Sequence, residues 1–179
     1  MKASTSVKKD FVMPVVVLTV ICIVISAALA VTNHLTADVI AQGAAERAEA
    51  ARAEIIPEAT GFELVEIDGL PDTVTEVYKT TNDVGYVFML SATGYGGEMS
   101  IICGIDNDGC IIAVKTLSHS ETKGMGSKTA DEPFRSQFVG KDSKLEGVEA
   151  ISGATISSKA YLGAIADAFT AFNMVTGVE

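Results

Sequence analysis

A short run of small and hydroxyl-bearing residues near the C-terminus has the composition of a phosphate-binding turn. Its four residues are Ser152, Gly153, Ala154 and Thr155. An apolar-periodic segment follows and predicts a helix over residues 156–175. A helix start carries unpaired N–H groups and a partial positive charge, and small residues let an anion approach closely. The turn therefore favours a bound phosphate, with the hydroxyls of Ser157 and Ser158 beside it.

The same turn has a simpler interpretation. A hydroxyl that precedes the first turn of a helix is typical of an N-cap, and Thr155 fits that role. In that case the turn binds no ligand. Four hydroxyls around Gly153 and Ala154 are more than capping requires, which favours the phosphate.

A second candidate segment is a glycine-rich loop about thirty residues upstream. It reads Glu121, Thr122, Lys123, Gly124, Met125 and Gly126. Glycines permit positive φ or close backbone approach, so such a loop can pack over a flat ring, although a plain glycine turn fits as well. His119 beside it is either a proton donor or a surface residue, and we favour the surface.

Together the two motifs resemble a known family. They are similar to the FMN-binding domains of the G subunit of the Rnf electron transport complex and of the related C subunit of the sodium-pumping NADH:quinone reductase. In that family the last threonine of the turn is esterified to the phosphate of FMN, which implies an FMN phosphoryl threonine at Thr155. The resemblance also implies that Glu121, Thr122, Gly124, Met125 and Gly126 line the isoalloxazine side, with Ser152, Gly153, Ala154 and Ser157 around the phosphate.

The resemblance implies an electron-relay flavoprotein within a membrane-bound, ion-translocating ferredoxin:NAD⁺ oxidoreductase, with covalent FMN and maturation by a separate flavin transferase. The chain has no Rossmann glycine motif and no iron–sulfur cysteine set, so nicotinamide and ferredoxin chemistry belong to partner subunits. No residue is expected to act as a catalytic acid or base, and no metal site is expected. Three alternatives stay open: the C subunit of the quinone reductase, an anchored non-redox binding module, and a released flavin carrier.

The N-terminal segment predicts the element that anchors this domain. Residues 11–37 carry no charge, and about 20 apolar residues span a bilayer. We expect residues 1–10 in the cytoplasm, because Lys2, Lys8 and Lys9 precede the apolar segment. A transmembrane helix is expected over residues 11–33, with Pro14 in its first turn. A helical stalk over 34–56 and an extracytoplasmic FMN-binding domain over 57–179 should follow. A cleaved signal peptide ending near Ala30 is the alternative.

The segment beyond residue 57 predicts an α+β domain. Five strands are expected over residues 62–67, 74–80, 84–92, 99–105 and 110–117, with a hairpin turn at Asn107, Asp108 and Gly109. A short helix over 132–138 follows, and the long C-terminal helix has an apolar face that should cover the antiparallel sheet.

The net charge limits the kinds of partner that the chain can bind, and the cysteine positions limit its possible disulfides. The net charge of −10 disfavours binding to nucleic acid. Cys22 lies in the apolar segment, while Cys103 and Cys110 flank the predicted hairpin turn. Ordinary buried thiols are the favoured interpretation, and a disulfide between Cys103 and Cys110 is the alternative.

Overall fold

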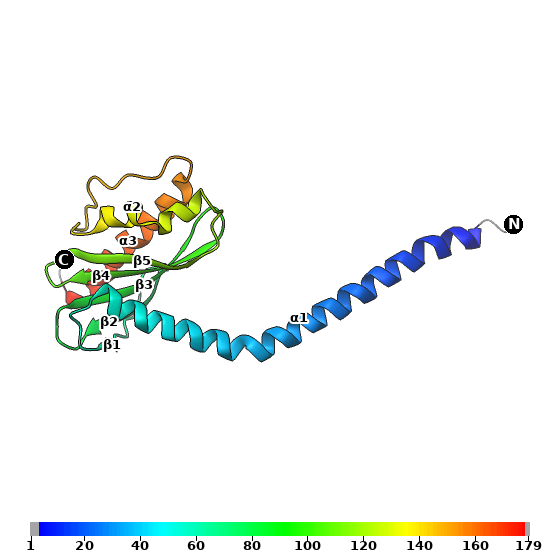
Figure 1. Cartoon of the computed structure of the whole chain (residues 1–179), viewed down its shortest axis with the longest axis horizontal. Coiled ribbons are helices and arrows are strands. Elements are labelled where there is room, and N and C mark those ends of the chain that lie inside the picture. Colours follow the sequence, from blue (N-terminus) through cyan, green and yellow to red (C-terminus); the bar gives the residue numbers. More distant parts are fainter. Residues whose placement is uncertain (1–3, 178–179) are drawn as a thin grey trace. The chain divides into compact units, whose positions relative to one another are not determined.

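The computed structural model describes residues 4–177, and the chain divides into two compact units at Glu46 and Arg47 (Figure 1). One helix, α1 (Ser4–Ile55), runs through the first unit and into the second. The second unit holds five strands, two further α-helices and two 3-10 helices. Their bounds are β1 (Phe62–Leu64), β2 (Val74–Thr80), β3 (Gly85–Thr93), β4 (Glu98–Asp106), β5 (Ile111–His119), η1 (Gly126–Ala130), α2 (Glu132–Arg135), η2 (Ser136–Phe138) and α3 (Thr155–Thr176). The predicted α+β class is confirmed.

Helix α1 contains the apolar segment. By length and composition alone it is the one helix of the described residues that could cross a membrane, over Val12–Ile55. The helix begins before the apolar run, so Pro14 lies in its interior, and the prediction of a first-turn proline is wrong. A proline there removes one backbone hydrogen bond, which a long helix tolerates. The helix ends two residues before Pro57, because a residue preceding proline disfavours helical backbone.

The five strands form one antiparallel sheet in the order β1-β2-β3-β4-β5. The predicted bounds of β2 match, whereas β1 is three residues shorter than expected. The predicted hairpin turn between β4 and β5 is confirmed. Asp106 Oδ1 accepts hydrogen bonds from the N–H groups of Asp108 (3.0 Å) and Cys110 (2.8 Å), and Gly109 supplies the positive φ of +78°.

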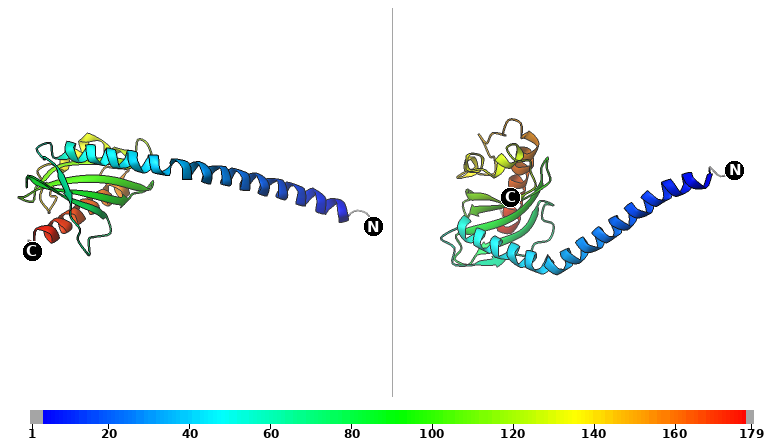
Figure 2. Two further views of the ribbon diagram at one scale, coloured as in Figure 1. Left: turned by 90° about the horizontal axis from the view of Figure 1, so that it is seen from below. Right: turned by 45° about the vertical axis from the view of Figure 1, so that its right-hand side comes forward.

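The two faces of the sheet carry separate hydrophobic cores. Along β3, Phe88 and Leu90 face the core shared with α3, while Val87 and Met89 face the opposite way, because successive strand residues alternate. The opposite core is closed by the last turns of α1, which begin the second unit (Figure 2). These turns contribute Ala51 and Ile55, and Ile56 follows directly after the helix. The sheet is therefore covered on both faces.

Gly104 on β4 lets the end of α1 approach the sheet. A Cβ atom at this position would overlap the side chain of Ile55 and lie 3.3 Å from Ile56. The sheet and the helix end are thus in direct contact at a residue without a side chain. This contact, entirely within the second unit, was not predicted from the sequence.

An aromatic cluster joins the segment that follows β5 to helix α3. Phe134, Phe138 and Tyr161 pack with ring centroids 5.4–5.6 Å apart. Burial raises the pKa of the Tyr161 phenol and of the Cys103 thiol well above their usual ranges. Cys103 is opposite Val114 in the sheet, and both Cys103 and Cys110 are free thiols, so the alternative of a disulfide between them is wrong.

Candidate functional site

Helix α3 begins at Thr155, and its N-cap is Ala154. Gly153 precedes the cap with φ of +81°, and the N–H of Ala154 donates to the carbonyl of Ile151 at 3.0 Å, which turns the chain into the helix. No side-chain capping hydrogen bond is present, and within residues 4–177 the exposed Thr155 hydroxyl makes no hydrogen bond. The N-cap interpretation of Thr155 is therefore wrong, because the residue lies one position too far into the helix.

The N-terminus of α3 also presents free backbone donors. The first helix-closing bond runs from the N–H of Ser158 to the carbonyl of Ala154 at 2.9 Å. In the described part of the chain, the N–H groups of Thr155, Ile156 and Ser157 donate to no protein acceptor. Three free donors and the positive end of a 22-residue helix dipole therefore lie at the same helix start as the free hydroxyl.

The neighbouring serine hydroxyls are engaged within the fold. Ser157 and Ser158 are buried. The Ser157 Oγ accepts a hydrogen bond from the N–H of Tyr95 at 3.3 Å, and the Ser158 Oγ accepts one from the N–H of Ile151 at 3.1 Å. The expected cluster of four available hydroxyls is wrong for Ser158, which ties the turn to the helix, whereas Ser157 still borders the open space.

Glu121 is the buried charged residue of the site. Its side chain is 8% exposed, and Oε2 accepts a hydrogen bond from the N–H of Gly96 at 3.2 Å. A Cβ at Gly94 would overlap Oε1, and a Cβ at Gly126 would overlap Oε2. Three glycines from two segments thus enclose this carboxylate. Glu121 holds the β3–β4 hairpin against the loop after β5, and its Oε1 has no partner among the described residues.

The loop after β5 is shaped by its own hydrogen bonds. The N–H groups of Met125 and Ser127 donate to the carbonyl of Thr122 at 3.2 and 3.3 Å. Gly124 has φ of +82°, and its N–H donates to the Ser127 Oγ at 2.9 Å. This glycine serves the turn, since nothing lies within 4 Å of its virtual Cβ.

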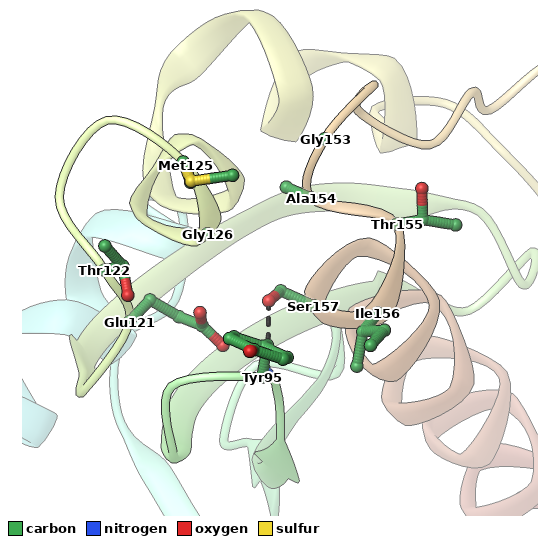
Figure 3. A pocket seen from close by; sticks show the side chains of 10 residues that line it. All are labelled: Tyr95, Glu121, Thr122, Met125, Gly126, Gly153, Ala154, Thr155, Ile156 and Ser157. Carbon is green, nitrogen blue, oxygen red and sulfur yellow. Dashed lines mark hydrogen bonds between the residues drawn. The ribbon is translucent and has the colours of Figure 1, made fainter.

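These segments enclose a pocket of about 440 Å³, within the range of small-molecule sites (Figure 3). The residues that line it are Tyr95, Glu121, Thr122, Met125, Gly126, Gly153, Ala154, Thr155, Ile156 and Ser157. Figure 3 places Thr155 and Ile156 at the start of α3, across from Thr122 and Met125 on the loop. Neither lysine nor arginine is among these lining residues.

The structure gathers eight of the ten sequence-predicted site residues around this pocket. Ser152 and Gly124 are exposed and lie outside the lining. Tyr95 and Ile156 line it but were not predicted as site residues. An aromatic residue isolated between Gly94 and the pair Gly96-Gly97 was the available signal, because such a residue must stand at a turn. His119 is exposed, as favoured from the sequence.

Comparison with known families and proteins identifies the domain. Residues 94–170 match the family model of the FMN-binding domain, and this range contains every residue that lines the pocket. The chain is similar to the G subunit of the Na⁺-translocating ferredoxin:NAD⁺ oxidoreductase complex of Acetobacterium woodii. The two are 34% identical over 80% of this chain and 83% of the relative.

Two further relatives are G subunits of complexes with related names. One belongs to the ion-translocating oxidoreductase complex of Methanosarcina acetivorans, at 35% identity over 88% of this chain and 92% of the relative. The other belongs to the proton-translocating ferredoxin:NAD⁺ oxidoreductase complex of Clostridium ljungdahlii, at 28% identity over 89% and 90%. The FMN-binding domain matches, and two G subunits are 34% and 35% identical to this chain over most of its length and of their own. This chain therefore belongs to the G-subunit family of ion-translocating oxidoreductase complexes.

Proposed function

We propose that this chain is an electron-relay subunit of a membrane-bound ion-translocating ferredoxin:NAD⁺ oxidoreductase, and that it carries FMN through a phosphoester to Thr155. The observation that carries the proposal is the exposed, unbonded hydroxyl of Thr155, a residue that lines the pocket. A hydroxyl that serves no structural purpose at a helix start is available for chemistry. The three relatives are all named as G subunits, which favours this assignment over the C subunit of a quinone reductase.

The start of α3 fits the phosphate end of FMN. Three free N–H groups and the helix dipole favour a negative charge there. No cationic side chain is among the residues that line the pocket, so none adds to the stabilisation of the phosphate. A helix terminus contributes roughly 0.3–1 kcal/mol to an exposed anion, which is too little to retain a nucleotide. A covalent bond removes the dependence on free ligand concentration.

The rest of the pocket fits the ring end. Tyr95, Met125 and Ile156 provide apolar surface, while Glu121 is turned toward its glycines and closes the space between the hairpin and the loop. Bound FMN supplies electron-accepting and electron-donating capacity, and the surrounding residues tune it by packing and by excluding water. The chain's own residues thus bind and orient, and none acts as an acid or base.

Attachment has a simple atom balance. The Thr155 Oγ1 gives up its proton and bonds to the flavin-side phosphorus of a flavin dinucleotide, whose phosphoanhydride P–O bond breaks and releases a nucleoside monophosphate. The protein therefore gains one FMN less one water. This reaction requires a flavin transferase as a maturation partner. Other subunits of the complex supply and remove electrons.

We further propose the topology in which residues 1–10 are cytoplasmic, 11–33 cross the membrane, 34–56 form a stalk and 57–179 form the extracytoplasmic domain. The apolar composition of α1 and the early lysines support this orientation. The acidic domain then lies outside, where the flavin transferase would act.

Gel electrophoresis tests the attachment. The full chain is co-expressed with a flavin transferase, denatured, and illuminated in the gel. We expect fluorescence on the wild-type band and none on Thr155→Ala. Ser152→Ala is the matched control, because this exposed hydroxyl of the same turn lies outside the pocket lining, and it should retain fluorescence. A fluorescent Thr155→Ala band would refute Thr155 as the acceptor.

A further inference from the structure

Tyr95 is the most exposed large apolar residue among the described residues of the second unit, although its backbone is firmly held. Its side chain is 76% exposed at the tip of the hairpin between β3 and β4. Its N–H donates to the Ser157 Oγ at 3.3 Å. On either side, the N–H of Gly94 donates to the carbonyl of Gly97 at 2.9 Å, and that of Gly96 donates to Glu121 at 3.2 Å. The fold fixes the residue and leaves its ring uncovered.

Two other exposed apolar side chains border the same pocket. Met125 is 54% exposed and Ile156 is 58% exposed. Beyond residue 47 the described chain has six exposed large apolar residues, and three of them, Tyr95 included, line this one pocket. Such clustering marks a surface that a ligand covers.

We propose that Tyr95 is a positioning residue that stacks its ring on the isoalloxazine ring, with Met125 approaching from the loop. This inference rests on the proposed function, and it assigns a role to a residue outside the predicted site. Figure 3 shows Tyr95 and Met125 entering the pocket from different segments. Flat π-systems attract each other in offset geometry, and a thioether adds favourable contacts with aromatic rings.

The anchored backbone makes this stacking efficient. A tyrosine has only two side-chain torsions to fix, so little conformational entropy is lost when its ring is covered. Because Ser157 is two residues after Thr155, the Tyr95 N–H to Ser157 Oγ bond ties the stacking residue to the helix turn that carries the attachment point. The backbone of Tyr95 is thereby held close to the attachment point.

The fluorescence lifetime of the attached flavin tests the stacking directly. A stacked phenol gives an electron to the photoexcited ring and takes it back, which shortens the lifetime without net chemistry. A phenyl ring stacks equally well but is much harder to oxidise. In the full chain loaded by co-expression, Tyr95→Phe should lengthen the lifetime with an unchanged absorption spectrum, and Tyr95→Ala should change both. Tyr78 packs on the opposite face of the sheet, so Tyr78→Phe should change neither the lifetime nor the absorption spectrum.

Non-covalent binding provides the second readout. In a Thr155→Val background, free FMN is titrated into the full chain, and we expect Tyr95→Ala to weaken binding roughly tenfold, equivalent to about 1.4 kcal/mol. Tyr95→Phe should bind as the parent does. Wild-type protein without attached flavin would overturn the proposed function itself. The stacking role alone would be overturned if the wild type carries flavin but neither Tyr95 substitution changes the fluorescence lifetime or the affinity for free FMN.

Discussion

The hydroxyl oxygen of Ser157 accepts a hydrogen bond from the backbone N–H of Tyr95 at 3.3 Å, across 62 residues of sequence. A second connection runs from Gly96 to Glu121, which belongs to the segment after β5. Two buried side chains thus join the hairpin, the loop and the start of α3. The shape of the pocket depends on these joints, and several consequences can be measured.

Ser157→Ala should loosen the hairpin tip. The substitution leaves the Tyr95 N–H without its acceptor, and the loss of one such hydrogen bond costs about 1 kcal/mol of unfolding free energy. Denaturant unfolding of the full chain and faster amide hydrogen exchange at Tyr95 would both report it. Ser136→Ala, at an exposed position, should stay within about 0.5 kcal/mol. Equal exchange rates in both variants would argue against the joint.

Gly126→Ala should disturb the pocket, whereas Gly124→Ala should not. A Cβ at Gly126 would overlap Glu121 Oε2 and lie 3.0 Å from the Ser157 Oγ, and both groups are buried. Overpacking of this kind costs typically about 1–3 kcal/mol. Alanine at Gly124 costs a similar amount, about 1–2 kcal/mol, through its left-handed backbone, but it meets no neighbour.

Visible absorption of the loaded protein separates these two glycine variants. Because both lose stability, only the flavin spectrum distinguishes damage to the pocket from strain in the loop. We expect a shifted spectrum for Gly126→Ala alone. Identical spectra would contradict the enclosure of Glu121 by glycines.

Gly104→Ala should weaken the contact between β4 and the end of α1. The added methyl group would overlap Ile55, which is buried, so we expect a loss of about 1–3 kcal/mol in unfolding free energy. Gly163→Ala is the matched control, since this glycine is exposed inside α3 with nothing within 4 Å of its virtual Cβ. It should stabilise the protein by up to about 1 kcal/mol. A neutral Gly104→Ala would contradict the close packing.

Tyr161→Phe should make the protein more resistant to alkali. Burial raises the pKa of Tyr161, and the Thr116 hydroxyl lies 3.4 Å from its phenol oxygen. Below about pH 10 the phenol is protonated in both the folded and the unfolded chain. Above that pH the unfolded chain releases the proton first, so stability falls as pH rises toward the raised pKa. Phenylalanine removes this loss and keeps the ring packing.

Unfolding free energies measured from about pH 8 to about pH 12, on either side of the ordinary phenol pKa, check this sign. The raised pKa of Cys103 also makes the free energy of unfolding fall as pH rises, and this fall begins at a lower pH because the ordinary pKa of a thiol is lower. Tyr161→Phe should therefore flatten only the high-pH part of the plot of unfolding free energy against pH. Parallel curves for wild type and variant would mean that the phenol is not protected by burial.

Patterns local in sequence predicted most of the elements. Turn-forming residues on either side indicated the bounds of β2, and the residues Asn107, Asp108 and Gly109 identified the hairpin turn, because short-range backbone preferences decide both. The end of α1 before Pro57 follows from the same kind of local sterics.

Features that depend on distant contacts were not predictable. The alternative interpretation of Thr155 as an N-cap was wrong by one residue, since the chain turns into the helix through the hydrogen bond from the Ala154 N–H to the Ile151 carbonyl. The glycines around Tyr95 indicated a turn, but its place beside the pocket depends on the hydrogen bond from its N–H to Ser157, 62 residues further along the chain. Tertiary pairing of this kind leaves no periodic trace in the sequence.

The mass of the intact protein tests the attachment of FMN at Thr155 most directly. Full chain is purified from membranes after co-expression with a flavin transferase, and is compared with Thr155→Ala prepared in the same way. We expect wild type to exceed its sequence mass by one FMN less one water, and the variant to show no addition. Unmodified wild type, or an equal addition on Thr155→Ala, would contradict the attachment.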